Sequence, residues 1–451
     1  MRAIGTASSA AARPLPCRPL AVTAVLTLAC PLPAFALDLD SVDGLIVETI
    51  ASRDRLKIYD TSKQNGAERV LDRDRDFATP EGLRMRSYYV HPGIGALIYF
   101  DDNIFRSDLN KVADIKTELT PSVRLRSALP RHILDLSLEG KIVSYLENPD
   151  QNYAGAKARL DAALHFDHAH TISASLLTAL EHEERGELAI KFLSAAEPIP
   201  VFHNKASVGI TRDVGRLYGT LMGTVETWDY IDADAIGGGT VDQDPRDTQE
   251  YSTALRFGYR ISPGFDFVGK VRAVKSENRG DLTFDRDATG YELMAGVAFQ
   301  SSPLLRWRVM GGYGTRNFEE PGIEDISTAL FEANMQWLPT QFVTVSGTAA
   351  REIIAADAVE PAGRVETRLR GQIDYEIWHS AILKLGLEYR DSDYIGTTRN
   401  DTQYSASAEL EYFMNKNWLF TIGYEYSIRE STEPAFDMTR NRFMLGAKLR
   451  W

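Results

Sequence analysis

The sequence has very little cysteine and, beyond its first 36 residues, no long apolar run. Its two cysteines, Cys17 and Cys30, both lie near the N-terminus. A disulfide scaffold is therefore excluded for the remainder of the chain, whose stability must come from packing and hydrogen bonding. A conventional transmembrane helix needs about eighteen or more consecutive apolar residues, and none follows position 36. Membrane-spanning strands are not excluded, because they alternate polar and apolar residues.

The chain also lacks an excess of basic residues. Its 63 acidic residues outnumber the 50 basic ones, and the net charge is −13. Because nucleic-acid binding depends on neutralising phosphates with Lys and Arg, a nucleic-acid partner is not expected.

Residues 1–36 have the three parts of an export signal. Basic residues up to position 18 precede the apolar stretch 20–30, and Ala34-Phe35-Ala36 matches an A-x-A cleavage site. We expect the mature chain to begin at Leu37. An alternative is a lipoprotein processed at Cys30, although the residues before this cysteine fit a lipobox poorly.

Residues 37–87 differ in composition from the rest. They are dense in charge of both signs, as in the run Asp72–Asp76, and show little period-2 alternation. This composition predicts a solvated, partly disordered periplasmic leader. The alternative is a docking segment for a periplasmic partner.

The last residues form a strongly alternating pattern. Phe443, Leu445, Leu449 and the terminal Trp451 share one parity, and basic residues occupy the other. Since a strand exposes alternate residues on opposite faces, this strand has one apolar and one cationic face. An apolar outer face that ends on an aromatic residue resembles the signal read by the outer-membrane barrel assembly machinery.

The same alternation recurs from residue 88 to residue 451. Eight short turns alternate with nine longer polar loops, which predicts about 18 strands, with 16–18 plausible. Unpaired backbone groups are costly in lipid, so only a closed sheet can span the membrane. The expected fold is an all-β, transmembrane, antiparallel up-and-down barrel in the bacterial outer membrane. Trp307, Trp337, Trp378 and Trp418 lie beside predicted periplasmic turns, as interfacial aromatics do.

The polar face of the predicted strands carries charges of both signs. One interpretation is a wet wall of cross-strand ion pairs. The other is a field that steers a polyanionic or hydroxyl-rich solute. The candidate pore-lining residues are Arg256, Arg260, Arg306, Arg308, Arg364, Glu366, Arg368, Arg370, Asp374, Lys384, Glu388, Arg440 and Arg442.

The predicted loop 183–202 is unusual because it contains an apolar, helix-capable segment. Leu188, Ile190, Phe192 and Leu193 would be costly to expose, so we expect them to fold into the mouth and constrict the pore.

No motif for metal binding or catalysis emerges. Asp232 and Asp234 in the acidic loop 229–248 loosely suggest calcium, but their spacing departs from an EF-hand. The histidines are scattered, and no serine lies in a nucleophile motif. No catalytic residue, metal or cofactor is therefore predicted.

Residues 83–108 contain Asp102-Asn103-Ile104-Phe105 after a strand that begins near a proline. This stretch, together with Ile115–Ser127, resembles the family called putative β-barrel porin 2. The resemblance implies an outer-membrane barrel without catalytic residues, often associated with exopolysaccharide export. It favours a conduit for a secreted polysaccharide, delivered by a periplasmic polysaccharide-export protein. The alternatives are a general or substrate-specific porin for small-solute uptake, or a non-conducting structural barrel.

Overall fold

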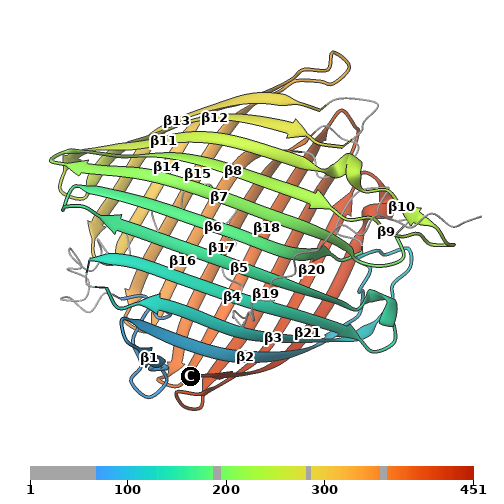
Figure 1. The fold of residues 1–451 in the computed structure, drawn as a ribbon, viewed down its shortest axis with the longest axis horizontal. Helices are drawn as coiled ribbons and strands as arrows, with labels where there is room; N and C mark the ends of the chain where they lie inside the picture. Colours follow the sequence, from blue (N-terminus) through green and yellow to red (C-terminus); the bar gives the residue numbers. More distant parts are fainter. Residues whose placement is uncertain (1–67, 130, 186–194, 281–285, 356–362) are drawn as a thin grey trace, which may run out of the picture.

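The computed structural model describes residues 68–451 except 130, 186–194, 281–285 and 356–362. Within these residues, eighteen antiparallel strands form a single closed wall (Figure 1). The wall strands are β2 (Tyr88–Asp101), β3 (Asp114–Ser127), β4 (His132–Tyr145), β5 (Tyr153–His165), β6 (His170–Glu183), β7 (Ile199–Val214), β8 (Leu217–Tyr230), β11 (Thr248–Ser262), β12 (Phe265–Asn278), β13 (Ala288–Ser302), β14 (Leu305–Phe318), β15 (Ile326–Thr340), β16 (Val343–Ala355), β17 (Gly363–Trp378), β18 (Ala381–Ile395), β19 (Asn400–Phe413), β20 (Trp418–Ser431) and β21 (Met438–Arg450).

The wall closes because its first and last strands pair with each other. β2 runs beside β3 on one edge and beside β21 on the other, from Gly93 opposite Arg450 to Asp101 opposite Arg442. No edge of the sheet is left unpaired at this seam, which is what a spanning sheet requires. The predicted barrel and its strand number are confirmed.

Short turns and long loops lie at opposite ends of the barrel. The turn end contains connections such as 379–380, together with the C-terminus at the lower left of Figure 1. The loop end, on the right, contains the small hairpin of β9 (Ala233–Asp234) and β10 (Thr240–Val241). Short 3-10 helices lie in three loops: η2 (Pro149–Gln151), η4 (Asp244–Arg246) and η5 (Pro434–Phe436). None of the helices in the described chain is long and apolar enough to cross a membrane.

The two faces of the wall differ as the alternation requires. In β21, Met444 is 7% exposed, whereas its neighbours Phe443 and Leu445 are 56% and 47% exposed. Leu449 shares their parity, and Trp451 follows the strand with its N–H donating to Pro92 O at 3.1 Å. The four residues of the predicted assembly signal therefore occupy the outer face and end of β21. Their recognition by the assembly machinery remains a prediction.

The stretch that carries the family resemblance fastens the seam at the loop end. Asp101 is buried and accepts hydrogen bonds from Arg440 Nε at 2.9 and 3.0 Å. Asp102 accepts a bond from the Asn441 N–H at 2.7 Å, and Asn103 Nδ2 donates to Thr439 O at 3.0 Å. Three consecutive residues, the last of β2 and the two that follow it, are thus bonded to β21, which gives this short motif a structural role.

Residues 68–82 run along the inside of the turn end and contact the wall, although several of them, such as Arg69 and Leu71, stay exposed. β1 (Leu83–Met85) pairs with the start of β2, and Val70 and Ala78 are buried. The composition of 37–87 predicts a solvated leader or a docking segment for a periplasmic partner, and neither includes these contacts with the barrel itself. The first part of that leader, 37–67, lies outside the described residues, so the predicted domain boundaries remain a prediction.

Candidate functional site

A cavity of about 1460 Å³ lies near the turn end, beside strands β11 to β16, and its lining mixes polar groups with apolar ones such as Trp307 and Met335. Three predicted pore-lining residues, Arg260, Arg306 and Arg308, contribute to it. Its neutral hydrogen-bonding side chains come from β11, β13, β15 and β16. They are Ser262, Gln300, Ser302, Asn334, Gln336, Ser346 and Thr348. We call this cavity the vestibule.

The vestibule has more guanidinium groups than carboxylates. Arg69 from the N-terminal segment and Arg216 also line it, whereas Asp266 is the single acidic residue among its described lining residues. Asp266 accepts a hydrogen bond from Tyr218 Oη at 2.8 Å. Arg260 donates to Asp213 at 2.8 and 2.9 Å. Arginines thus outnumber carboxylates among the described lining residues, although Arg260 and Arg69 each pair with an aspartate beside the cavity.

A second group of predicted residues forms a charge network on β17 and β18. Glu366, whose side chain is 1% exposed, lies 2.5 Å from Arg368, 3.4 Å from Arg364 and 3.8 Å from Arg390. Glu388 lies 2.6 Å from Arg370 and 2.8 Å from Arg390. The partners lie on one strand or on adjacent strands, so these pairs follow the wall without crossing the lumen.

The remaining predicted residues lie on the same inner face. Lys384 of β18 pairs with Glu409 at 3.0 Å and with Glu411 at 2.9 Å. Asp374 accepts a hydrogen bond from Gln372 Nε2 at 2.7 Å. On β21, Arg440 pairs with Asp101 and Arg442 with Glu425. Their role in conduction remains a prediction.

Strands β11 to β15 are joined by ion pairs that skip strands. Arg256 of β11 lies 3.6 Å from Glu332 of β15, and Arg316 of β14 lies 3.2 Å from Glu250 of β11. Intervening strands separate both pairs in the sheet order, so the side chains must reach across the inner concave surface. Glu332 is 6% exposed and Arg316 is 4% exposed. These pairs therefore extend over the inner face of the strands between them.

An apolar cluster occupies the inner face of the same strands. Val268, Met294, Met310 and Leu330 are buried there and pack with Ile353. Neither this cluster nor the neutral amides of the vestibule were among the residues predicted from the sequence. Apolar residues at inward positions of successive strands were the available signal, as in Phe265–Val274, where alternation is poor.

The predicted constriction residues Leu188, Ile190, Phe192 and Leu193 lie outside the described residues. The described start of their loop does turn inward. Glu184 is buried, lies 3.1 Å from Arg106, pairs with Lys116 of β3, and accepts a bond from Tyr153 Oη at 3.0 Å. Constriction by the loop therefore remains a prediction.

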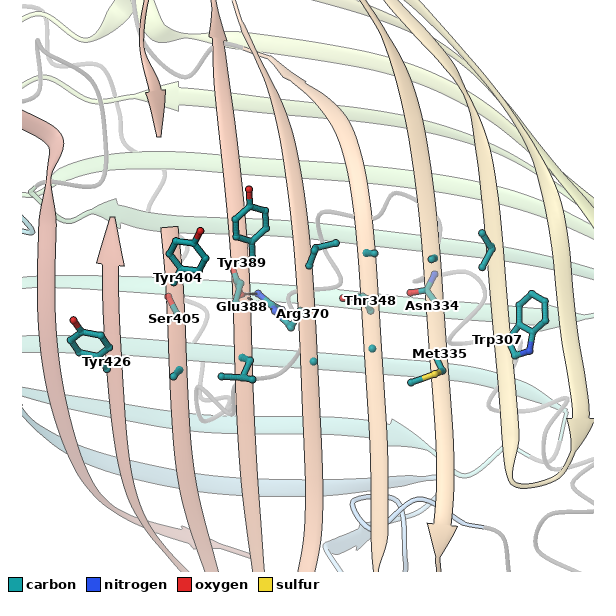
Figure 2. Close-up of a pocket in the computed structure, with 18 residues that line it drawn as sticks. Trp307, Asn334, Met335, Thr348, Arg370, Glu388, Tyr389, Tyr404, Ser405 and Tyr426 are labelled. Atoms are coloured by element: carbon teal, nitrogen blue, oxygen red, sulfur yellow. Dashed lines mark hydrogen bonds and ion pairs between the residues drawn. The ribbon is translucent and has the colours of Figure 1, made fainter. Parts of the chain in front are cut away.

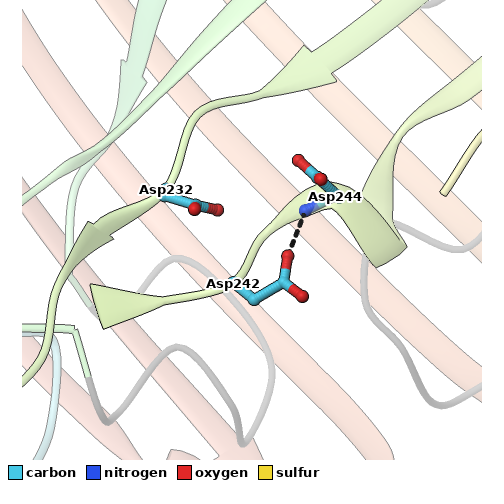
Figure 3. A group of neighbouring side chains, drawn as sticks. All are labelled: Asp232, Asp242 and Asp244. Atoms are coloured by element: carbon cyan, nitrogen blue, oxygen red, sulfur yellow. Dashed lines mark hydrogen bonds between the residues drawn. The ribbon is translucent and has the colours of Figure 1, made fainter. Parts of the chain in front are cut away.

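Three aspartates of the loop 231–247 lie close together (Figure 3). One carboxylate oxygen each from Asp232, Asp242 and Asp244 falls within 4.8 Å of the others, and all three residues are exposed. Asp232 and Asp242 accept backbone hydrogen bonds, from the Gln243 N–H at 2.9 Å and the Asp244 N–H at 3.0 Å. Capping of the loop backbone accounts for two of the carboxylates, and we assign no metal to them.

An apolar groove of about 830 Å³ follows the outer face of β14 to β20 (Figure 2). Trp307, Met335, Tyr389, Tyr404 and Tyr426 border it. Gly371, which lies among them, has open space where a side chain would extend. Since this face carries the exposed apolar residues of the wall, the groove is part of the membrane-facing surface and not a solute site.

No curated protein sequence matches the chain. The crystal structure of OccAB4 from Acinetobacter baumannii aligns with 80% of this chain and 98% of its own, at 10% identity and a TM-score of 0.43. That of OccK8 (OprE) from Pseudomonas aeruginosa aligns with 81% and 99%, at 11% identity and a TM-score of 0.45. These superpositions are loose and carry no argument about function.

A family model matches most of the chain and therefore shows which family the protein belongs to. The family model described as "Putative beta-barrel porin 2" matches residues 76–451, which include every wall strand and the end of the N-terminal segment. The chain belongs to this family of outer-membrane β-barrel porins.

Proposed function

We propose that the protein is a passive outer-membrane pore for small polar solutes that are anionic or rich in hydroxyl groups. The observation that carries this proposal is the vestibule, in which arginines and neutral amides converge on one water-accessible cavity. Amide and hydroxyl groups hydrogen-bond a solute, and guanidinium groups attract negative charge. The turn end faces the periplasm in barrels of this kind, so the vestibule is the inner end of the path.

Uptake of small solutes is better supported than the export of a polysaccharide. The family match and the structural similarities give no support for exopolysaccharide export. A hydrated polymer needs a wide, continuous lumen, whereas Arg256–Glu332 and Arg316–Glu250 cross part of this one. A small solute needs only the space between such side chains.

Reconstitution into planar bilayers tests the proposal directly. We expect single-channel currents with a preference for anions, measured as the reversal potential under a salt gradient. Arg306→Gln with Arg308→Gln should shift the reversal potential toward cation preference. Arg124→Gln is the matched control, because Arg124 is bonded to Asp135 on β4, away from the vestibule.

Two outcomes would contradict the proposal. The absence of current from correctly folded barrels would favour a non-conducting structural role. Loss of surface polysaccharide on gene deletion, without any change in solute uptake, would restore export.

A further inference from the structure

The N-terminal segment Glu68–Gly82 is held inside the turn end of the barrel, and we call it the strap. Its start reaches β16, where the Val70 N–H donates to Thr344 Oγ1 at 3.0 Å and both residues are fully buried. Its end leads into β1, which pairs with β2. The strap therefore passes from the first wall strand to β16 on the inner side of the sheet.

Two arginines of the strap bind one carboxylate of the wall. Arg73 Nη1 lies 2.6 Å and Arg75 Nη2 lies 3.1 Å from Glu376 Oε2. Glu376 is 5% exposed and lies near the end of β17. Charge-assisted bonds of this kind are stronger than neutral ones, so the pair forms a defined latch.

The wall around the latch is acidic. Asp374, Glu409 and Glu411 face the same part of the lumen, and Lys384 of β18 pairs with the last two. Because carboxylates outnumber the wall's own cations in this set, the strap's arginines complement the charge of the surface that they cover. The run Asp72–Asp76 alternates acidic and basic residues, so the segment is also compatible with water when it leaves the wall.

Few apolar contacts hold the strap. Val70 and Ala78 are buried, the Phe77 ring lies 4.9 Å from the His379 ring, and Arg450 Nη2 donates to Ala78 O at 2.8 Å. The strap contributes no strand to the wall. A segment held mainly by ion pairs and a few hydrogen bonds opens at low cost compared with a strand that is paired along both edges.

We propose that the strap is a gate of the periplasmic mouth, latched by Arg73 and Arg75 on Glu376. In the latched state the strap lies over the inner wall from β16 to β21 and narrows the mouth. In the released state the mouth widens and the acidic wall is exposed to solutes. This inference rests on the proposed pore function.

A disulfide between the strap and the wall tests the gate. Val70→Cys and Thr344→Cys introduce thiols on two buried residues that are in contact through the Val70 N–H, and formation of the cross-link is checked before conductance is measured. The two natural cysteines, Cys17 and Cys30, precede the expected mature start at Leu37 and add no thiol to the mature chain. We expect the oxidised protein to conduct less than the same protein after reduction. Equal conductance in both states, with the cross-link verified by mass spectrometry, would overturn the gate and leave the pore intact.

A second measurement does not depend on conduction. A single Val70→Cys variant is labelled with a maleimide, with and without Glu376→Gln. Because a hydrogen bond to a charged group is worth about tenfold or more in an equilibrium constant, labelling should accelerate by roughly tenfold when the latch is removed. The matched control is Glu425→Gln, whose partner Arg442 lies on the wall and not on the strap. Equal labelling rates in all three proteins would show that the strap is not latched by Glu376.

The two measurements separate the failure of the gate from the failure of the pore. Accelerated labelling with no current in any state would retain the latch but reject both the pore and its gating. Current without any effect of the cross-link or of Glu376→Gln would retain the pore and reject the gate.

Discussion

Two parts of the inner wall use similar residues in different ways. On β17 and β18, arginines and glutamates pair with partners on the same or the next strand, as Glu388 does with Arg370 and Arg390. On β11 to β15, Arg256–Glu332 and Arg316–Glu250 skip strands and lie beside an apolar cluster. The first region, which we call the lateral network, leaves the lumen open. The second, the bridged sector, fills part of it.

The difference between the two regions shows that an ion pair on the inner face of a barrel can have one of two roles. A pair within the wall neutralises charge and keeps the surface wet. A pair that crosses the concave surface also determines how wide the path is. The apolar side chains of the bridged sector supply packing that most lumen walls lack, so this sector resembles a small core inside the barrel.

The largest expected effect lies in the lateral network. Glu366→Ala removes a buried carboxylate shared by three arginines, of which Arg390 keeps its pair with Glu388. We expect a loss of about 3–5 kcal/mol in the free energy of unfolding, as for a broken buried pair. Urea unfolding in lipid vesicles, followed by tryptophan fluorescence, measures it. Glu425→Ala, with one half-buried partner, should cost much less.

The apolar cluster of the bridged sector should rank next. Met310→Ala removes a side chain that is 3% exposed among Met294 and Leu330. The expected loss is about 2 kcal/mol or more, because a cavity remains. Gly311→Ala on the opposite face is the control, since nothing lies within 4 Å of an added Cβ there. Equal stability of the two variants would show that the cluster is not a packed core.

Removing an ion pair that skips strands in the bridged sector should have a smaller effect on stability but a larger effect on conduction. Arg256→Gln with Glu332→Gln neutralises a pair that crosses the lumen. We expect a higher single-channel conductance and a change of only about 1 kcal/mol or less in stability, since both charges are removed together. Arg370→Gln with Glu388→Gln is the lateral counterpart and should leave the conductance nearly unchanged. The distinction between the two regions fails if both double variants behave alike.

The barrel itself could be predicted from the sequence, whereas its interior could not. Alternation and turn residues depend on local chemistry, so the sequence predicts the strands and the outward face of β21 with Phe443 and Leu445. It also predicts that Arg368 and Lys384 point inward. The bridges depend on the curvature of the wall, which places Arg256 near Glu332. The residues next to Arg256 and Glu332 in the sequence do not indicate that the two side chains meet.

The strap shows the same limit more clearly. A run such as Asp72–Asp76 is typical of solvated segments, and its charge density alone predicts a position in solvent. Glu376, the partner of Arg75 in this run, lies about three hundred positions further along the chain. The burial of Glu376 depends on the closed barrel around it. A charged segment that complements a charged wall cannot be told from a solvated one by composition.

The smallest expected effect concerns the loop that joins β8 to β11, at the outer end of the bridged sector. Asp247 accepts a hydrogen bond from the Tyr230 N–H at 2.7 Å. Burial, with help from the nearby carboxylates of Asp229 and Asp244, raises the pKa of Asp247 to about 6. An unfolded aspartate titrates near about 3.9, so between these values the folded loop binds more protons than the unfolded one. The stability contributed at this site is therefore present at low pH and is lost as the pH rises toward 6.

Hydrogen exchange of residues 231–247 at pH 5 and pH 7, corrected for intrinsic rates, measures this dependence. We expect less protection at pH 7 in the natural protein and equal protection at both pH values in Asp247→Asn, which cannot ionise. Asp229→Asn should retain the dependence with a lower midpoint, because it removes one of the charges that raise the pKa of Asp247. If the natural protein shows equal protection at both pH values, Asp247 is solvated and the outer end of the bridged sector is as open as the lateral network. If the dependence persists in Asp247→Asn, another group is responsible, and the loop is coupled to the charges of the bridges beneath it.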